Sequence, residues 1–274
     1  MTRLDVNGLS FNVLDEGSGT PVLLLHGFPD NSRLWRNVIP SLTAAGYRTI
    51  APDMRGFGES DRPGDVAEYR LDKILADVTG ILDALGVERA HVVGHDFGAV
   101  ISWVFAMLQP DRVDHLVAIS VGAPGGEPRS IQQQRASWYM FAFQFPGVTE
   151  EWLMRDDWRV FDGWLDGTYP DLATAKQELS RPGALTAALN WYRGLARPEV
   201  LLGARLPLPQ VKAPTLGIWS DGDIALLESQ MTSSENMVAG PWRYERIEGV
   251  GHWIPLEAAE RLNELLLEFF ATPA

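Results

Sequence analysis

The feature that most constrains the fold of this chain is a short apolar run that ends in a glycine-flanked turn. Val92 and Val93 lead into Gly94-His95-Asp96-Phe97-Gly98, and an apolar stretch with helical spacing follows at once. A turn from strand to helix that is this sharp presents its middle side chain at the top of a sheet, and the glycines allow close packing of the backbone. The middle residue is Asp96. The pattern alone leaves two interpretations, a carboxylate nucleophile or a helix N-cap, a position that Asp favours.

Strand-like runs alternate with helical patterns on both sides of this turn. The expected strands are 4–6, 9–14, 22–25, 47–51, the run before the turn, 113–120, 214–219 and 242–247. One expected helix starts near residue 32, and two others span 69–85 and 255–270. Such alternation predicts an α/β fold, with a mostly parallel sheet and helices on both of its faces. Asn7-Gly8 indicates a tight hairpin that supplies antiparallel strands at one edge.

The segment 124–212 has a different pattern, without a buried strand and with many aromatic residues. It predicts a helical cap, with helices at 130–143, 149–156, 171–180 and 183–195, inserted after the sixth strand of a core formed by 1–123 and 213–274. An insertion at this point would cover the carboxyl ends of the strands, where ligands bind in open α/β sheets. An aromatic cluster is nevertheless more often plain core than a binding site.

Composition excludes several classes of function. The net charge of −13 argues against nucleic acid and anionic membranes as partners, whereas a small apolar substrate is indifferent to it. The chain has no cysteine, and its five histidines show no metal-ligand spacing, so we expect no metal. It also lacks an apolar run of roughly 20 residues and an apolar leader, so we expect a cytoplasmic protein. A homo-oligomer is compatible with the sequence.

Four candidate active residues fall at the carboxyl ends of expected strands: Phe28, Asp96, Asp223 and His252. The order of nucleophile, acid and base is the order of the α/β-hydrolase triad. His252 is selected because it follows a strand in a Gly-rich loop, whereas His95 should point away from the nucleophile. Asp223 should orient the imidazole, with Asp221 as its competitor. The backbone N–H groups of Phe28 and Phe97 should form an oxyanion hole.

Several motifs together resemble the soluble epoxide hydrolases of the α/β-hydrolase superfamily. They are His26-Gly27-Phe28-Pro29, the segment 53–60 and Gly94-His95-Asp96-Phe97-Gly98, and the resemblance covers nearly the whole chain. Tyr139 and Tyr192 stand where that family has its two cap tyrosines. Phe97 departs from the Trp that many members have, and Met140 departs from the Gln that some have. Both changes should reshape the pocket without removing a reacting group.

The resemblance implies a mechanism without a cofactor. Tyr139 and Tyr192 would donate to the oxygen of an apolar epoxide while Asp96 attacks carbon and forms an ester. His252, oriented by Asp223, would activate the water that releases a vicinal diol. The residues expected to line the substrate pocket are His26, Pro29, Trp138, Phe143, Trp191 and Trp253.

Other activities stay open as alternatives. Haloalkane dehalogenases share the Asp turn but hold the halide on N–H donors, one of them usually a Trp where this chain has Phe97. Fluoroacetate dehalogenases carry Arg at that position and again three residues later, where this chain has Val100. An esterase would have Ser at position 96. A hydrolase-like receptor that binds an apolar ligand without turnover is the alternative from another class. The sequence does not identify the natural epoxide, or the regiochemistry and enantiopreference of its opening.

Overall fold

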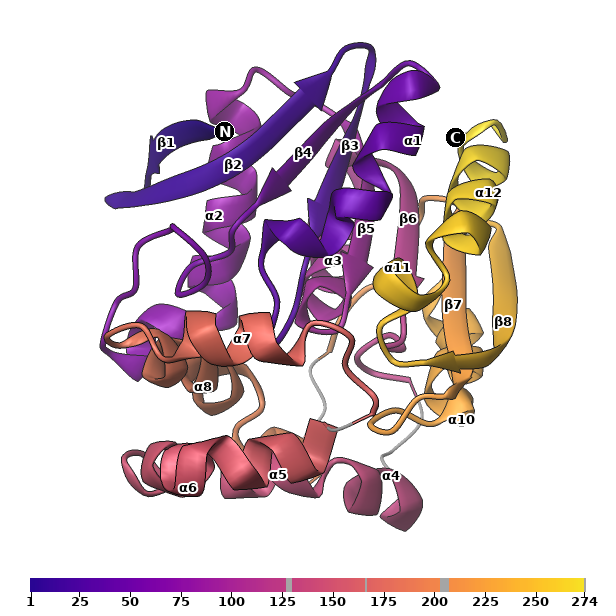
Figure 1. The fold of residues 1–274 in the computed structure, drawn as a ribbon. Coiled ribbons are helices and arrows are strands. Elements are labelled where there is room, and N and C mark those ends of the chain that lie inside the picture. The colour runs from indigo at the N-terminus through magenta and orange to yellow at the C-terminus, as the bar shows by residue number, and fades with distance from the viewer. Residues whose placement is uncertain (127–129, 166, 203–206, 274) are drawn as a thin grey trace.

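The computed structural model describes residues 1–126, 130–165, 167–202 and 207–273. Its strands are β1 Thr2–Val6, β2 Leu9–Gly17, β3 Thr20–Leu25, β4 Tyr47–Pro52, β5 Ala90–His95, β6 Val113–Ile119, β7 Thr215–Gly222 and β8 Trp242–Gly251. They form one sheet in the order β1-β2-β4-β3-β5-β6-β7-β8, parallel from β4 onward (Figure 1). The expected α/β-hydrolase fold is therefore confirmed.

The N-terminal hairpin forms the antiparallel edge of this sheet. Asn7 and Gly8 both have positive φ, 53° and 80°, which is the requirement of a type I′ turn. The turn fixes the register of β1 on β2, with Val6 opposite Leu9, and β2 then pairs antiparallel with β4. The sequence predicted both the turn and the edge.

Helices cover both faces of the sheet. On the core they are η1 Ser32–Asn37, α1 Ile39–Ala44, η2 Val66–Tyr69, α2 Leu71–Ala84, α3 Phe97–Leu108, η3 Pro110–Arg112, α10 Glu228–Thr232, η4 Ser233–Met237, α11 Ile254–Glu257 and α12 Ala259–Phe270. In Figure 1, α1, α11 and α12 lie in front of the sheet, and α2 and α3 lie behind it. The helix predicted over 255–270 is two helices, because Ala258 leaves helical geometry at φ −134° and ψ 39°.

The segment after β6 is helical, as expected. Its helices are α4 Ile131–Ala136, α5 Trp138–Ala142, α6 Val148–Leu165, α7 Leu172–Leu179, α8 Ala184–Leu195 and α9 Pro198–Leu201. The helix predicted over 130–143 is divided at Ser137, and α6 is longer than predicted but loses helical geometry over residues 155–158. Sequence analysis missed α9. The boundaries of the cap at 124 and 212 stay a prediction.

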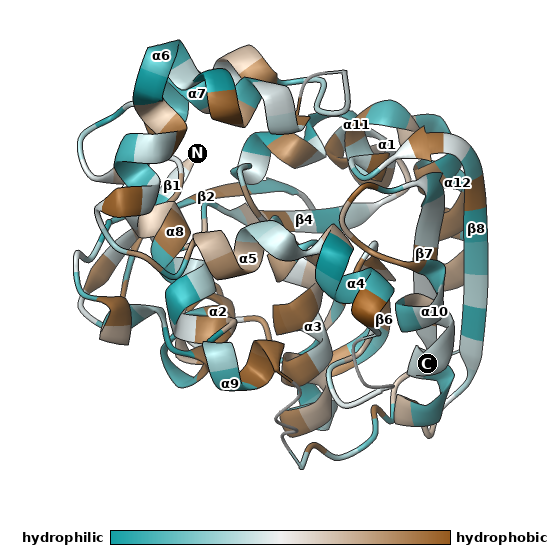
Figure 2. Cartoon of the chain, turned by 90° about the horizontal axis from the view of Figure 1, so that it is seen from below, coloured by the Kyte–Doolittle hydropathy of each residue, from teal (hydrophilic) through white to brown (hydrophobic). Residues whose placement is uncertain are grey.

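These helices lie across one end of the sheet (Figure 1). Figure 2 views the molecule from that end and shows α3 as an almost continuously apolar helix, whereas α6 and α7 carry both polar and apolar residues. The difference reflects burial, since α3 packs on β3, β5 and β6. No helix in the described ranges is both long and apolar enough to span a bilayer.

Candidate active site

The turn between β5 and α3 has the strained backbone that its glycines predict. Asp96 has φ 54° and ψ −122°, an uncommon conformation for a residue with a side chain. A Cβ at Gly94 would collide with the carbonyl of Gly98, and a Cβ at Gly98 would collide with the carbonyl of Leu25. Both positions therefore require glycine, and the packing holds Asp96 at the carboxyl end of β5.

The Asp96 carboxylate faces the loop after β3. Its Oδ1 accepts a hydrogen bond of 2.8 Å from Phe28 N, and the N–H of Phe97 also donates to the carboxylate. Asp96 occupies the N-cap position of α3, but in the described structure its side chain makes no capping hydrogen bond, so capping does not account for the orientation of the carboxylate. Gly27 allows this approach, because a Cβ there would collide with the Asp96 side chain.

His252 follows β8 and lies between two carboxylates. Its Nδ1 is 2.8 Å from Asp223 Oδ2, and its Nε2 is 3.8 Å from Asp96 Oδ2. Burial lowers the pKa of His252, but the charges of Asp223 and Asp96 outweigh burial and raise this pKa to about 9. Burial also raises the pKa of Asp96, against the opposing charge of His252 and the two backbone N–H groups.

Asp223, and not Asp221, is the partner of His252. The Asp223 carboxylate is fully buried, and its Oδ1 accepts hydrogen bonds from the N–H groups of Ala225 and Leu226 at 2.8 and 2.9 Å. Asp221 Oδ1 instead accepts from Gly249 N. Because the second oxygen of Asp223 binds His252 Nδ1, the imidazole is held with Nε2 toward Asp96.

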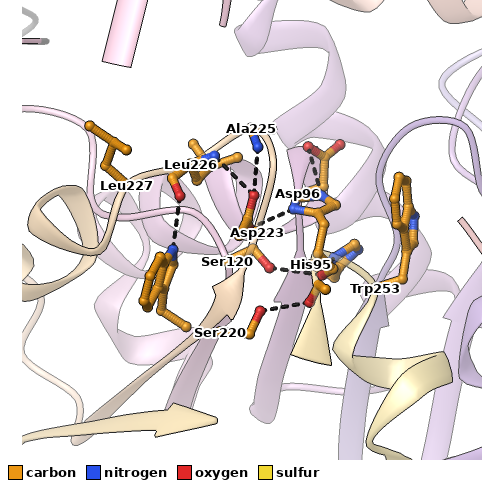
Figure 3. A network of polar contacts seen from close by, with 12 residues as sticks. His95, Asp96, Ser120, Ser220, Asp223, Ala225, Leu226, Leu227 and Trp253 are labelled. Atoms are coloured by element: carbon orange, nitrogen blue, oxygen red, sulfur yellow. Dashed lines mark hydrogen bonds and ion pairs between the residues drawn. The ribbon is translucent and has the colours of Figure 1, made fainter. Parts of the chain in front are cut away.

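Polar side chains beneath the triad hold the loop that carries His252 (Figure 3). The His252 carbonyl accepts from His95 Nε2 at 2.9 Å and from Ser120 Oγ at 3.1 Å, and the Gly251 carbonyl accepts from Ser220 Oγ at 2.6 Å. A carbonyl can only accept, so the proton of His95 is on Nε2. Burial lowers the pKa of His95 and keeps its ring neutral. As expected, His95 does not line the pocket, but sequence analysis missed this contact.

Tyr139 on α5 and Tyr192 on α8 line one pocket with Asp96 and His252. The two phenol rings lie edge to face with centroids 5.9 Å apart. Burial raises the pKa of Tyr192, and the proximity of Tyr139 and Asp96 raises it further. The Tyr192 hydroxyl therefore stays protonated at neutral pH and can donate to an oxygen in the pocket.

The space between the residues of the pocket, including its opening to solvent, is about 310 Å³. The residues that line it are Phe28, Pro29, Asp96, Tyr139, Trp164, Leu165, Tyr192, Ile224, Ala225, His252 and Trp253. Pro29 and Trp253 lie where the sequence predicted them. Sequence analysis missed Ile224 and Ala225, although both directly follow Asp223 at a strand end, and that position is a usable signal. Trp164 and Leu165 had no such signal.

Two buried residues predicted to line the pocket, one in the core and one on α8, do not line it. His26 is buried, and its Nε2 accepts from Met54 N at 2.9 Å, so it joins two loops of the core. Trp191 is buried, and its indole N–H donates to the carbonyl of Arg55 at 2.9 Å. The prediction was wrong for both because their polar atoms are satisfied by core backbone.

Two cap residues were also misplaced. Trp138 is 46% exposed and packs edge to face on Trp152, on the outer side of the cap. Phe143 is fully buried behind Tyr192, with ring centroids 4.9 Å apart. The pocket prediction was wrong for these two residues, because successive residues of a helix point in different directions and because Tyr139 and Tyr192 pack between Phe143 and the pocket.

Asp30 is a buried acid near the triad that sequence analysis missed. Its oxygens accept from Tyr169 Oη at 2.7 Å and from Trp253 Nε1 at 3.1 Å. Burial raises the pKa of Asp30 to about 7, against the opposing effect of these two hydrogen bonds. Asp30 thus joins the segment between α6 and α7 to the loop of His252. The described residues contain no group of three His, Asp or Glu side chains arranged to hold a metal ion.

Comparisons with known proteins agree with this geometry. The model of the alpha/beta hydrolase fold family matches residues 20–259. The chain is 33% identical to epoxide hydrolase A of Mycobacterium tuberculosis, over 97% of this chain and 95% of that protein, and 33% identical to an epoxide hydrolase of Caballeronia sordidicola, over 97% and 92%. It superposes on the epoxide hydrolase of Bacillus megaterium, solved with an inhibitor, with a TM-score of 0.86 and 26% identity, over 99% of this chain and all of that one.

Proposed function

Because the chain belongs to the alpha/beta hydrolase fold family and to its epoxide hydrolases, we propose that it opens an apolar epoxide to a vicinal diol through an ester on Asp96. The observation that carries the proposal is one pocket lined by a buried carboxylate, an imidazole and two phenols. An epoxide carbon needs a nucleophile and its oxygen needs an acid, and this pocket offers both. Water is the second substrate.

In the first step Asp96 Oδ2 attacks an epoxide carbon. Oδ1 is held by Phe28 N, so Oδ2 is the oxygen that is free to react. The carbon–oxygen bond of the epoxide breaks, and its electron pair goes to the oxygen, which takes a proton from one of the two tyrosines. The products of this step are a hydroxyalkyl ester and a tyrosinate that its neighbouring phenol stabilises.

In the second step His252 activates water. Esterification removes the charge of Asp96, and with it one of the interactions that raise the pKa of His252. The lower pKa allows the imidazolium to release its proton to solvent, and the neutral imidazole then takes a proton from the water that attacks Cγ. The negative charge develops on Oδ1, where the N–H groups of Phe28 and Phe97 stabilise it. The Cγ–Oδ2 bond then breaks, the departing alkoxide takes the proton of His252, and the proton of the new Asp96 carboxyl restores the tyrosine. After the ester is hydrolysed and the charge of Asp96 returns, the imidazole regains a proton from solvent.

Dehalogenation is less well supported by the same pocket. A departing halide needs N–H donors, and the Phe97 side chain has none. The indole N–H groups of Trp191 and Trp253 are engaged by the Arg55 carbonyl and by Asp30, which leaves Trp164 as the candidate indole donor in the pocket. A receptor without turnover would not need the pairing of Asp223 with His252.

The proposal is tested by trapping the ester. His252→Gln protein incubated with styrene oxide should accumulate an adduct on Asp96, detected by peptide mass spectrometry, since alkylation proceeds without the base. Asp96→Ala should form no adduct, and Asp221→Asn, a matched change on the surface, should keep full turnover. An adduct on another residue, or halide release from haloalkanes without diol from styrene, terpene or fatty-acid epoxides, would refute the proposal.

A further inference from the structure

The face of α4 that turns toward the core is polar, which is unusual for a helix that covers a pocket of apolar residues. Gln133 is 1% exposed and Ser137, one turn later, is 2% exposed, whereas Gln132 and Arg135 are exposed to solvent. A buried amide must find hydrogen-bond partners, because otherwise the loss of its hydration destabilises the folded chain. The partners of Gln133 therefore indicate what this helix is for.

Gln133 binds the loop that follows the acid of the triad. Its Nε2 donates to the Ala225 carbonyl at 2.7 Å, and its Oε1 accepts from Leu227 N at 2.9 Å. A carbonyl and an N–H two residues apart are the groups that an extended chain offers to a neighbouring strand. The Gln133 amide thus takes the place of a strand partner. The same Nε2 donates to Ser137 Oγ at 2.7 Å, which orients the amide.

The residues between these two contacts hold the Asp223 carboxylate. Asp223 Oδ1 accepts from the N–H groups of Ala225 and Leu226, and Figure 3 shows both bonds beside the triad. The Leu226 carbonyl accepts from Trp219 Nε1 at 3.0 Å, which fixes the loop from the sheet side. Gln133 fixes the same loop from the cap side.

Gln133 also lies close in sequence to Tyr139, the proposed acid. Ser137 precedes α5, and Tyr139 lies on the single turn of that helix. The pair Gln133 and Ser137 therefore connects the segment that carries Tyr139 with the segment that orients His252 through Asp223.

From these contacts we propose that Gln133 is a positioning residue that holds Tyr139, the acid of the cap, and His252, the base of the core, in their relative positions. The inference rests on the proposed function, because it assigns Gln133 to both steps of that reaction. Without the amide, Asp223 is held less firmly against His252 and Tyr139 is held less firmly over Asp96. Both half-reactions should then slow together.

Loss of the amide should also move the pH dependence of ester hydrolysis. The titratable groups that face His252 are Asp96, Asp223, Asp30 and His95. Of these, Asp223 contributes the strongest interaction that raises the pKa of His252. A loosened Asp223 lowers that pKa, so the midpoint at which the base becomes neutral moves to lower pH.

Two variants and a control separate this role from simple packing. Gln133→Leu removes all three hydrogen bonds of the amide at similar volume, and Gln132→Leu makes the same change on the exposed face of α4. In Gln133→Glu the ionised carboxylate would place an acceptor against the Ala225 carbonyl, whereas the protonated acid can donate there and accept from Leu227 N. Each is examined by single-turnover kinetics of alkylation and hydrolysis with styrene oxide across pH 5.5–9, with circular dichroism as the check of folding.

We expect Gln133→Leu to slow both steps at least tenfold and to move the hydrolysis midpoint to lower pH, while Gln132→Leu matches the wild type. The activity of Gln133→Glu relative to wild type should rise at least fivefold as pH falls from 8.5 to 5.5. The inference would be overturned if folded Gln133→Leu kept both rates within twofold of wild type, or if the activity of Gln133→Glu relative to wild type did not change with pH. Neither result would affect the proposed function, because the wild type would still make diol. A wild type that makes no diol would instead refute the proposed function.

Discussion

At the scale of single residues, the two oxygens of Asp96 have different surroundings. Oδ1 is bound by a backbone N–H of the loop after β3, and Oδ2 faces the imidazole and the pocket. One oxygen is therefore placed to carry charge and the other to react. Above them, Tyr139 and Tyr192 lie on separate helices and reach the pocket together. Because burial raises the pKa of Tyr192, its hydroxyl keeps its proton at neutral pH, as the proposed role of a donor requires.

Replacing both tyrosines should act mainly on the first step. The double variant Tyr139→Phe, Tyr192→Phe should slow the alkylation of Asp96 by on the order of 10²–10⁴-fold, because the epoxide oxygen loses its acid. Quenching of tryptophan fluorescence in a single turnover measures this rate. Tyr47→Phe is the control, since Tyr47 packs on His91 and Phe270. A double variant that alkylates at the wild-type rate would contradict the assignment.

At the scale of elements, a histidine pair connects two central strands to the last helix. His91 on β5 and His115 on β6 approach with their Nδ1 atoms 3.1 Å apart, and the His91 ring stacks on Phe270 of α12 at 4.2 Å. Burial lowers the pKa of His91 to about 4, and the charge of His115 contributes in the same direction. Protonation of His91 is therefore less favourable in the folded chain than in the unfolded chain.

This pair predicts a loss of stability in mild acid. The unfolded chain binds a proton at His91 below about pH 6.5, whereas the folded chain does so only near pH 4. The unfolded state binds more protons in this window, so the free energy of unfolding falls as pH falls, by on the order of 2 kcal/mol from pH 7 to pH 5. Urea denaturation of His91→Phe, which keeps a ring against Phe270, should show this decrease reduced by about that amount. An equal decrease in the variant and the wild type would exclude His91 as its source.

At the scale of the whole molecule, the net charge of −13 surrounds a pocket lined by Asp96, and the buried Asp30 and Asp223 lie around His252. A negative field of this kind does not act on a neutral epoxide, but it repels an anionic one. The field therefore contributes to selectivity independently of pocket shape.

Ionic strength should reveal this contribution. For styrene oxide, kcat/KM should stay constant between 10 mM and 500 mM salt. For an epoxide that carries a carboxylate, kcat/KM should rise with salt, because screening shortens the range of the repulsion. Initial rates of diol formation measure both. A carboxylated epoxide whose kcat/KM falls with salt would show that a local cation, and not the overall field, controls its binding.

The succession of strands and helices along the chain could be predicted from the amino-acid sequence, as could the placement of Asp96, Asp223 and His252 after strands. Short-range sequence patterns specify these features, because turns at glycine, hairpin turns and strand ends depend on a few neighbouring residues. It left Asp221 open as a competitor of Asp223, and the structure separates them, because β7 extends through Gly222 and His252 Nδ1 binds Asp223. The roles of these residues in catalysis stay predictions.

The contacts between cap residues and the core could not be predicted from the sequence and became known from the folded structure. Periodicity shows which side of a helix is apolar, but not which element lies opposite that side. For this reason Trp138 and Trp191 were expected in the pocket, whereas Trp164 and Ile224 line it. For the same reason Gln133 has no signal in the sequence. A glutamine in a polar helix looks solvated until the fold brings the loop after Asp223 within hydrogen-bond distance of its amide.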